Sequence, residues 1–87
     1  MVNIVEVVLE LQADGFINSD RTTRGRVLRV LQNGKFTCQV EAKVRGVDLP
    51  EGPYASLDEA RIALMAFWDK CNIALQTNPY WQELERK

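Results

Sequence analysis

Apolar and polar residues alternate strictly over the ten residues from Lys35 to Val44. The apolar positions of this run are Phe36, Cys38, Val40, Ala42 and Val44. A period of two over this length is typical of a strand with one buried and one solvated face, as in an antiparallel sheet. The pattern therefore predicts one continuous strand over residues 35–44.

A hairpin is expected immediately before this strand, because Asn33-Gly34 is a strong turn signal and residues 26–31 can supply the partner strand. A two-residue loop would place Arg29 on the buried face, where an unpaired charge costs several kcal/mol. A three-residue loop that ends at the glycine pairs Val30 with Phe36 and turns Arg29 towards solvent. We therefore expect the three-residue loop.

The opening segment, residues 3–13, fits two structures. As a strand it places five apolar residues on one face, namely Val5, Val7, Leu9, Leu11 and Ala13. As a helix it gathers its acidic residues on one side and leaves the remainder apolar. The many β-branched residues favour the strand, but a short apolar run does not decide between the two by its period alone.

A long helix is expected from Ser56 to about Gln76. Ser56 is the expected N-cap, and Glu59 at the third helical position completes a capping box. A helical-wheel projection places the apolar residues of an expected core stripe on one side of this helix, namely Leu57, Ala60, Leu64, Phe67, Trp68, Cys71, Ala74 and Leu75. Asn78-Pro79 then predicts the end of this helix and the start of a short second one.

These elements predict an α+β fold in a single domain over residues 1–87. We expect an antiparallel three- to four-stranded β-meander packed on one long α-helix, with a short C-terminal helix. A chain of 87 residues is long enough for one small soluble core and too short for two.

The long helix has more apolar side chains than one sheet can cover. Ile62, Met65, Ala66 and Ile73 fall opposite the core stripe, and Asp69 and Lys70 interrupt them. Three interpretations are open. These residues are scattered exposed apolar residues, which are ordinary, or Tyr80 and Trp81 fold back and cover them. Alternatively, they form a contact surface for a partner. Small domains often gain stability by oligomerisation.

The leading hypothesis is therefore a small non-enzymatic protein-interaction module. It is expected to bind a second copy of itself, as a homodimer, or another protein. The contact residues of this hypothesis are Ile62, Met65, Ala66, Ile73, Tyr80 and Trp81.

Charge is distributed unevenly along the chain. Residues 20–45 hold seven basic and two acidic residues, although the net charge of the whole chain is -1. A basic hairpin of this kind could track a phosphate backbone, or could be a solvated face or half of a self-contact. The outward positions of residues 35–44 hold no aromatic side chain for base stacking. Nucleic-acid binding is therefore the second hypothesis, with Arg21, Arg24, Arg26, Arg29 and Lys43 as contacts.

Two short segments carry a family resemblance. The hairpin sequence NGKF (residues 33–36) and the helix opening YASLDEARIAL (residues 54–64) resemble the arm-type DNA-binding domains of phage integrases. They are also similar to several small β-sheet-plus-helix modules without an assigned function. The resemblance implies three strands followed by a helix, and DNA binding. Those DNA-binding domains are usually far more basic than this chain.

Several kinds of chemistry are missing from the sequence. The chain has no histidine, which excludes histidine-based triads and histidine zinc sites. Cys38 and Cys71 lie far apart in the sequence at inward positions, so we expect two buried, reduced thiols and a cytoplasmic location. We expect no catalytic residue, metal, cofactor or membrane span.

A third hypothesis is a small-ligand pocket between helix and sheet. Its walls would be the aromatic residues Tyr54, Trp68, Tyr80 and Trp81. A short chain without a catalytic signature would also suit an accessory gene of a phage, an integron or a plasmid.

Overall fold

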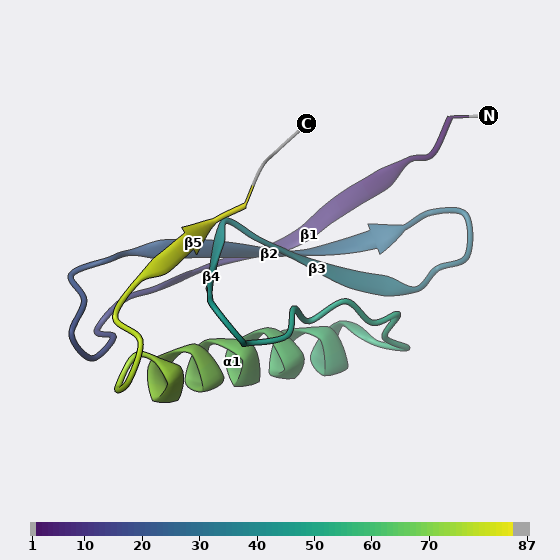
Figure 1. The fold of residues 1–87 in the computed structure, drawn as a ribbon. Helices are drawn as coiled ribbons and strands as arrows, with labels where there is room; N and C mark the ends of the chain where they lie inside the picture. The colour runs from purple at the N-terminus through teal and green to yellow at the C-terminus, as the bar shows by residue number, and fades with distance from the viewer. Residues whose placement is uncertain (1, 85–87) are drawn as a thin grey trace.

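The computed structural model describes residues 2–84 of the chain. Its elements are β1 (Val5–Ala13), β2 (Thr23–Val30), β3 (Phe36–Val40), β4 (Ala42–Val44), α1 (Leu57–Ala74) and β5 (Trp81–Glu83). Strands β1, β2 and β3 form an antiparallel sheet in sequence order, and β4 pairs with β5. Helix α1 covers one face of the three-stranded sheet (Figure 1). The α+β class with antiparallel sheets and one long helix is therefore confirmed. The expected single meander of three to four strands is instead one three-stranded sheet and one two-stranded sheet within residues 2–84.

The opening segment is a strand, which settles the ambiguity between strand and helix, but the strand is not regular. A β-bulge at Val8 separates two registers, because Val7 lies opposite Leu28 whereas Leu9 lies opposite Val27. Val27 is fully buried beneath α1, so Leu9 also faces the helix. The expectation that Val5 and Val7 share a face with Leu9 is therefore wrong, because the extra residue returns them to the opposite face.

The β2–β3 hairpin has a longer loop than expected. Arg29 lies opposite Phe36, and the backbone N–H of Gly34 donates to the Val30 carbonyl at 2.8 Å. The loop covers residues 31–34, so neither the two-residue nor the three-residue register occurs. Arg29 therefore lies on the same face as Phe36, so the expectation that it turns to the opposite, solvated face is wrong. Its side chain is nevertheless exposed and forms an ion pair with Glu6 across β1 and β2.

The predicted continuous strand over residues 35–44 is divided at Glu41. Its first part, β3, pairs with β2, and its second part, β4, pairs with β5. The backbone N–H of Glu41 donates to the Arg24 carbonyl, and its carbonyl accepts from Leu84. The alternation of buried residues continues through the bend, since Val40, Ala42 and Val44 are all buried. The change of partner strand, which the alternation cannot reveal, is what divides the run.

Helix α1 begins where the sequence predicts. The Ser56 hydroxyl accepts from the Glu59 backbone N–H at 3.1 Å, and the Glu59 carboxylate accepts from the Ala55 N–H at 2.9 Å. The first contact satisfies an N–H group that the first helical turn leaves unpaired, and the second holds the residue before the cap. The helix ends at Ala74, slightly before the expected end.

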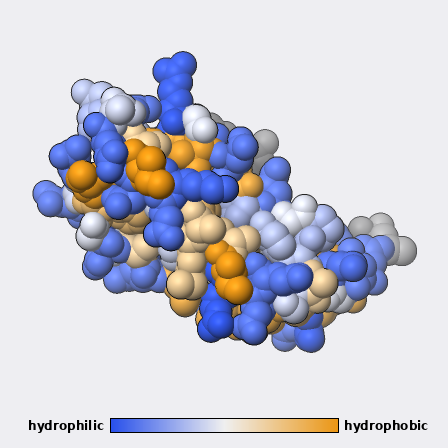
Figure 2. Space-filling view, turned by 90° about the horizontal axis from the view of Figure 1, so that it is seen from below, coloured by the Kyte–Doolittle hydropathy of each residue, from blue (hydrophilic) through white to orange (hydrophobic). Residues whose placement is uncertain are grey.

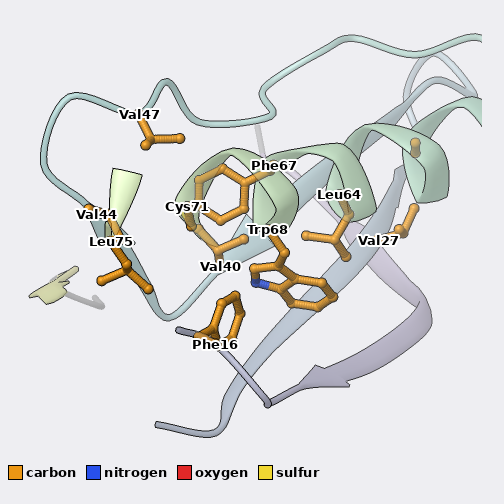
Figure 3. Packing of buried hydrophobic residues seen from close by; sticks show 11 residues of the cluster. Phe16, Val27, Val40, Val44, Val47, Leu64, Phe67, Trp68, Cys71 and Leu75 are labelled. Carbon is orange, nitrogen blue, oxygen red and sulfur yellow. The ribbon is translucent and has the colours of Figure 1, made fainter. Parts of the chain in front are cut away.

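The core lies between α1 and the sheet. Most of the predicted stripe is buried there, comprising Ala60, Leu64, Phe67, Trp68, Cys71 and Leu75. They pack with Val27 and Val40 from the sheet and with Phe16 from the β1–β2 loop (Figure 3). Leu57 differs from the prediction because it is exposed at the first turn of α1.

The predicted short C-terminal helix is wrong. Among residues 2–84 the structure has one helix, and Trp81–Glu83 form β5. The Trp81 ring packs edge-on against Phe16, with 4.9 Å between ring centroids and 77° between planes. Its indole N–H donates to the Ser19 hydroxyl at 3.1 Å. These tertiary contacts hold the segment extended against β4, and they outweigh the local helix-start signal.

Candidate interaction surfaces

The outer side of α1 exposes the apolar residues that the sequence analysis singled out. We call Ile62, Met65, Ala66 and Ile73 the α1 ridge. Exposure reaches 61% for Ile62, 52% for Met65 and 66% for Ile73, and Ala66 is exposed as well. Figure 2 views this side of the molecule and shows hydrophobic patches separated by hydrophilic side chains. The ridge is therefore accessible, but it is not one continuous apolar surface.

The described part of the C-terminal segment, residues 79–84, does not cover the α1 ridge. Strand β5 pairs with β4 and runs from the end of α1 towards the three-stranded sheet, away from the outer side of α1 (Figure 1). Trp81 is half-buried against Phe16, and Tyr80 is exposed. Trp81 therefore does not lie with the predicted contact residues on the outer side of α1. The Tyr80 ring is exposed to solvent.

Three of the five predicted nucleic-acid contacts form ion pairs with glutamates. Arg26 binds Glu10 at 3.1 Å across β1 and β2, and Arg29 binds Glu6. Arg21 pairs with Glu83, and its guanidinium lies 5.3 Å from the Trp81 ring centroid. These pairs leave less positive charge available to phosphates than the sequence count implies.

The five basic residues also do not lie on one surface. Arg24 and Arg26 alternate with the buried residues of β2, so Arg24 projects from the uncovered face of the sheet, as does Arg26. Arg29 lies on the helix-facing side, opposite Phe36. Lys43 is on β4 opposite Gln82. Of these four residues, the structure brings only Arg24 and Arg26 together.

The four aromatic residues of the ligand hypothesis do not line a common pocket. Tyr54 pairs with Phe36 through its backbone, whereas Trp68 is buried in the core. A shallow hollow of about 370 Å³ lies beside Trp68, between α1 and the β1–β2 loop, and Met65 of the α1 ridge contributes to its wall. The Trp68 indole N–H is buried and has no hydrogen-bond partner within the described part of the chain. Small-ligand binding by this chain stays a prediction.

Both cysteines are free thiols in the structure. Cys71 is fully buried, and Cys38 is half-buried with its sulfur 3.3 Å from the Ala60 carbonyl, to which the thiol donates. Burial raises the pKa of Cys38 to about 11, and burial also raises the pKa of Cys71. Thiols that hold their protons at neutral pH are poor nucleophiles.

The two serine hydroxyls have structural roles. The Ser56 hydroxyl caps α1, and the Ser19 hydroxyl accepts hydrogen bonds from the Trp81 indole and the Arg21 backbone. No group of three metal-ligating side chains occurs among residues 2–84. Within the same range, no helix is both long enough and apolar enough to cross a bilayer.

A second exposed apolar surface escaped the sequence analysis. The bulge at Val8 turns Val5 and Val7 to the uncovered face of the sheet, opposite Val30 and Leu28 of β2. We call Val5, Val7, Leu28 and Val30 the β1 strip. Val5 is 46% exposed and Val7 is 55% exposed. The adjacent pair Val7-Val8, which interrupts the alternation of β1, was the only sequence signal of this change of face.

The chain was also compared with family models, with curated proteins and with solved structures, and none of them matches it.

Proposed function

We propose that this chain is a small non-enzymatic protein-interaction module that forms a homodimer through the α1 ridge. The observation that carries the proposal is the exposure of Ile62, Met65 and Ile73 on a helix whose other side supplies the core. Apolar side chains of this size lose about 1.5–3 kcal/mol each when left in water instead of a protein interior. A partner that covers them recovers part of this free energy.

A second copy fits the ridge when the two helices run antiparallel. Ile62 of one copy then lies near Ile73 of the other, about 16 Å apart along one helix at about 1.5 Å per residue. Asp69 and Lys70 bring one charge of each sign to the middle of the contact. In this register Lys70 of each copy lies about 6 Å along the helix axis from Asp69 of the other copy. The long Lys70 side chain spans this distance, so the charges of opposite sign offset each other across the contact.

The test is the solution mass of the wild-type chain and of the double variant Ile62→Asp/Ile73→Asp. We expect the wild type to associate at micromolar concentration and the variant to lose the contact through α1, because four buried charges per dimer oppose it. Gln12→Asp/Gln39→Asp is the matched control, since it adds the same charges to exposed sites on the other face. Equal masses for the wild type and the ridge variant contradict the proposal.

Nucleic-acid binding is the second candidate, and one observation favours it. No element among residues 2–84 covers the face of the three-stranded sheet opposite α1 (Figure 1). Arg24 and Arg26 project from this face. A salt titration of binding to duplex and single-stranded DNA, with Arg24→Gln/Arg26→Gln as the variant, tests this candidate. Affinity that does not fall as salt rises excludes phosphate tracking. The cytoplasmic location and the accessory role in a mobile element also stay predictions.

A further inference from the structure

We propose that a second copy of this chain pairs along the outer edge of β1 and extends the three-stranded sheet across a two-fold axis. The pairing segment is residues 4–8, which run antiparallel to the same residues of the second copy. This surface is separate from the α1 ridge, and the proposal does not depend on the ridge.

The outer edge of β1 has free backbone groups. β1 is the first strand of the sheet order β1-β2-β3, so within residues 2–84 only β2 pairs with it. The Ile4 carbonyl accepts from the Leu31 N–H at 3.2 Å, so Ile4 directs its backbone groups towards β2. Because these directions alternate in an antiparallel ladder, Val5 and Val7 direct their N–H and C=O groups away from β2.

The opposite edge of the sheet differs. There, the N–H and C=O of Phe36 in β3 both bond to Tyr54, at 2.9 Å and 2.8 Å. This contact covers the start of the β3 edge with the chain's own backbone. The edge of β1 therefore offers an accessible template for strand pairing, whereas the edge of β3 is partly occupied.

The side chains beside the free edge are apolar. Val5 and Val7 of the β1 strip lie half-exposed on the uncovered face, and Ile4 is exposed as well. Proteins commonly protect exposed edges with lysine, proline, inward-pointing charges or bulges. Residues 2–13 contain no lysine or proline, and the charge of Glu6 is paired with Arg29. The bulge at Val8 ends the regular part of the edge. This length sets the extent of the proposed pairing.

The sequence of this edge favours a second copy over an unrelated strand. Residues 4–8 read Ile-Val-Glu-Val-Val, which has the same order of apolar and acidic residues in both directions about Glu6. A two-fold axis at Glu6 places Val5 of each copy opposite Val7 of the other. The β1 strips of the two copies then join into one apolar surface on the same face.

The charge at the axis is already compensated. Each Glu6 carboxylate binds the Arg29 guanidinium of its own chain at 2.5 Å. The dimer axis therefore brings together two acidic and two basic groups, with no net charge. Without Arg29, two glutamates directly opposite each other would oppose pairing.

A cysteine at position 6 tests the pairing and its register. In this register the two copies of residue 6 form a non-hydrogen-bonded pair with Cα atoms about 4.5 Å apart, within the range that disulfides span. Under mild oxidation we expect Glu6→Cys to form a disulfide between the two Cys at position 6. Mapping by mass spectrometry separates this bond from bonds to Cys38 or Cys71.

Glu10→Cys is the matched control. Glu10 lies on the same strand, is exposed, and also has an arginine partner, Arg26. In the proposed register the two copies of residue 10 lie more than about 20 Å apart. Pairing raises the effective concentration at position 6 alone, so we expect at least about tenfold faster crosslinking for Glu6→Cys. Equal rates for the two variants, or no bond between the two positions 6, overturn the proposal.

A second variant does not depend on thiol chemistry. Val7→Lys adds a charge to the β1 strip, and Gln12→Lys adds the same charge to the uncovered face of β1 beyond the bulge. We expect Val7→Lys to lose association that Gln12→Lys retains, even in the Ile62→Asp/Ile73→Asp background. If only the ridge variant changes the solution mass, the edge pairing is wrong and the proposed function stands. If only Val7→Lys changes the solution mass, the edge pairing stands and the proposed homodimer through the α1 ridge is wrong.

Discussion

Gly25 of β2 lies directly against Leu64 of α1, where a Cβ atom on the glycine would be 2.8 Å from Leu64 Cδ1. The same atom would be 3.0 Å from the Trp68 ring. Such distances are shorter than van der Waals contact, so the helix can approach the sheet this closely only because position 25 has no side chain. Gly25 therefore permits close packing of α1 on β2 at this point.

Gly25→Ala is expected to destabilise the fold. Overpacking of a filled core typically costs about 1–3 kcal/mol in the free energy of unfolding. Urea denaturation measures the loss. Leu64→Ala removes the atom that the new methyl group meets, so the double variant should lose less than the sum of the two single losses. Additive losses would show that Gly25 does not restrain this helix.

The cap of α1 is expected to contribute measurably to stability. Ser56→Ala removes the acceptor for the Glu59 N–H, and loss of such a cap costs about 0.5–2 kcal/mol. Ser56→Asp keeps an acceptor near the positive end of the helix and should restore most of the loss. The thermal midpoints of the three proteins check this, and an unchanged midpoint for the alanine variant would contradict the role of the cap.

Trp81 is expected to fix β5 to the body of the protein. Trp81→Phe keeps a ring against Phe16 but loses the donor to Ser19, which we expect to cost about 0.5–1.5 kcal/mol. Trp81→Ala also loses the ring packing and should cost more. Hydrogen exchange of β4 and β5 is the informative measurement. If the exchange of both strands is unaffected in the alanine variant, Trp81 does not hold this ladder.

The half-buried thiol of Cys38 predicts a loss of stability in alkali. In the unfolded chain the thiol ionises near its ordinary pKa of 9.0, whereas burial raises the pKa to about 11 in the fold. Its contribution is therefore fully present below about pH 9 and is lost as the pH rises towards about 11. Urea midpoints across this range measure the loss.

Cys38→Ser provides the control for this titration, because serine does not ionise there and retains a donor for the Ala60 carbonyl. We expect a shallower fall in stability for the variant over the same pH range.

We also expect slow alkylation of both thiols in the native protein and fast alkylation in urea. Rapid native alkylation of Cys71 would contradict its burial.

Local signals predicted the helix well. Ser56 and Glu59 define its start within one turn, and the 100° periodicity separates its buried stripe from its exposed apolar residues. These are short-range properties, so no knowledge of the rest of the chain is needed to find them. The exposure of the α1 ridge is the part of the candidate site that the sequence predicted.

Other features depend on tertiary contacts and could not be predicted in the same way. The alternation over residues 35–44 continues through Glu41 and contains no sign that the strand changes partner there. Asn78-Pro79 is a reasonable sequence signal for a helix start, but the packing of Trp81 against Phe16 stabilises the extended conformation more. The bulge at Val8 places the side chains of Val5 and Val7 on the opposite face of the sheet. The β1 strip could therefore not be found by counting alternate residues.

Self-association is the central claim, and the molar mass of the wild-type chain tests it most directly. Sedimentation equilibrium over low to high micromolar concentrations measures this mass. We expect a reversible rise from the 9.9 kDa of one chain to at least twice that value, because each of the two proposed surfaces pairs two copies. A mass that stays at 9.9 kDa throughout this range would contradict the claim.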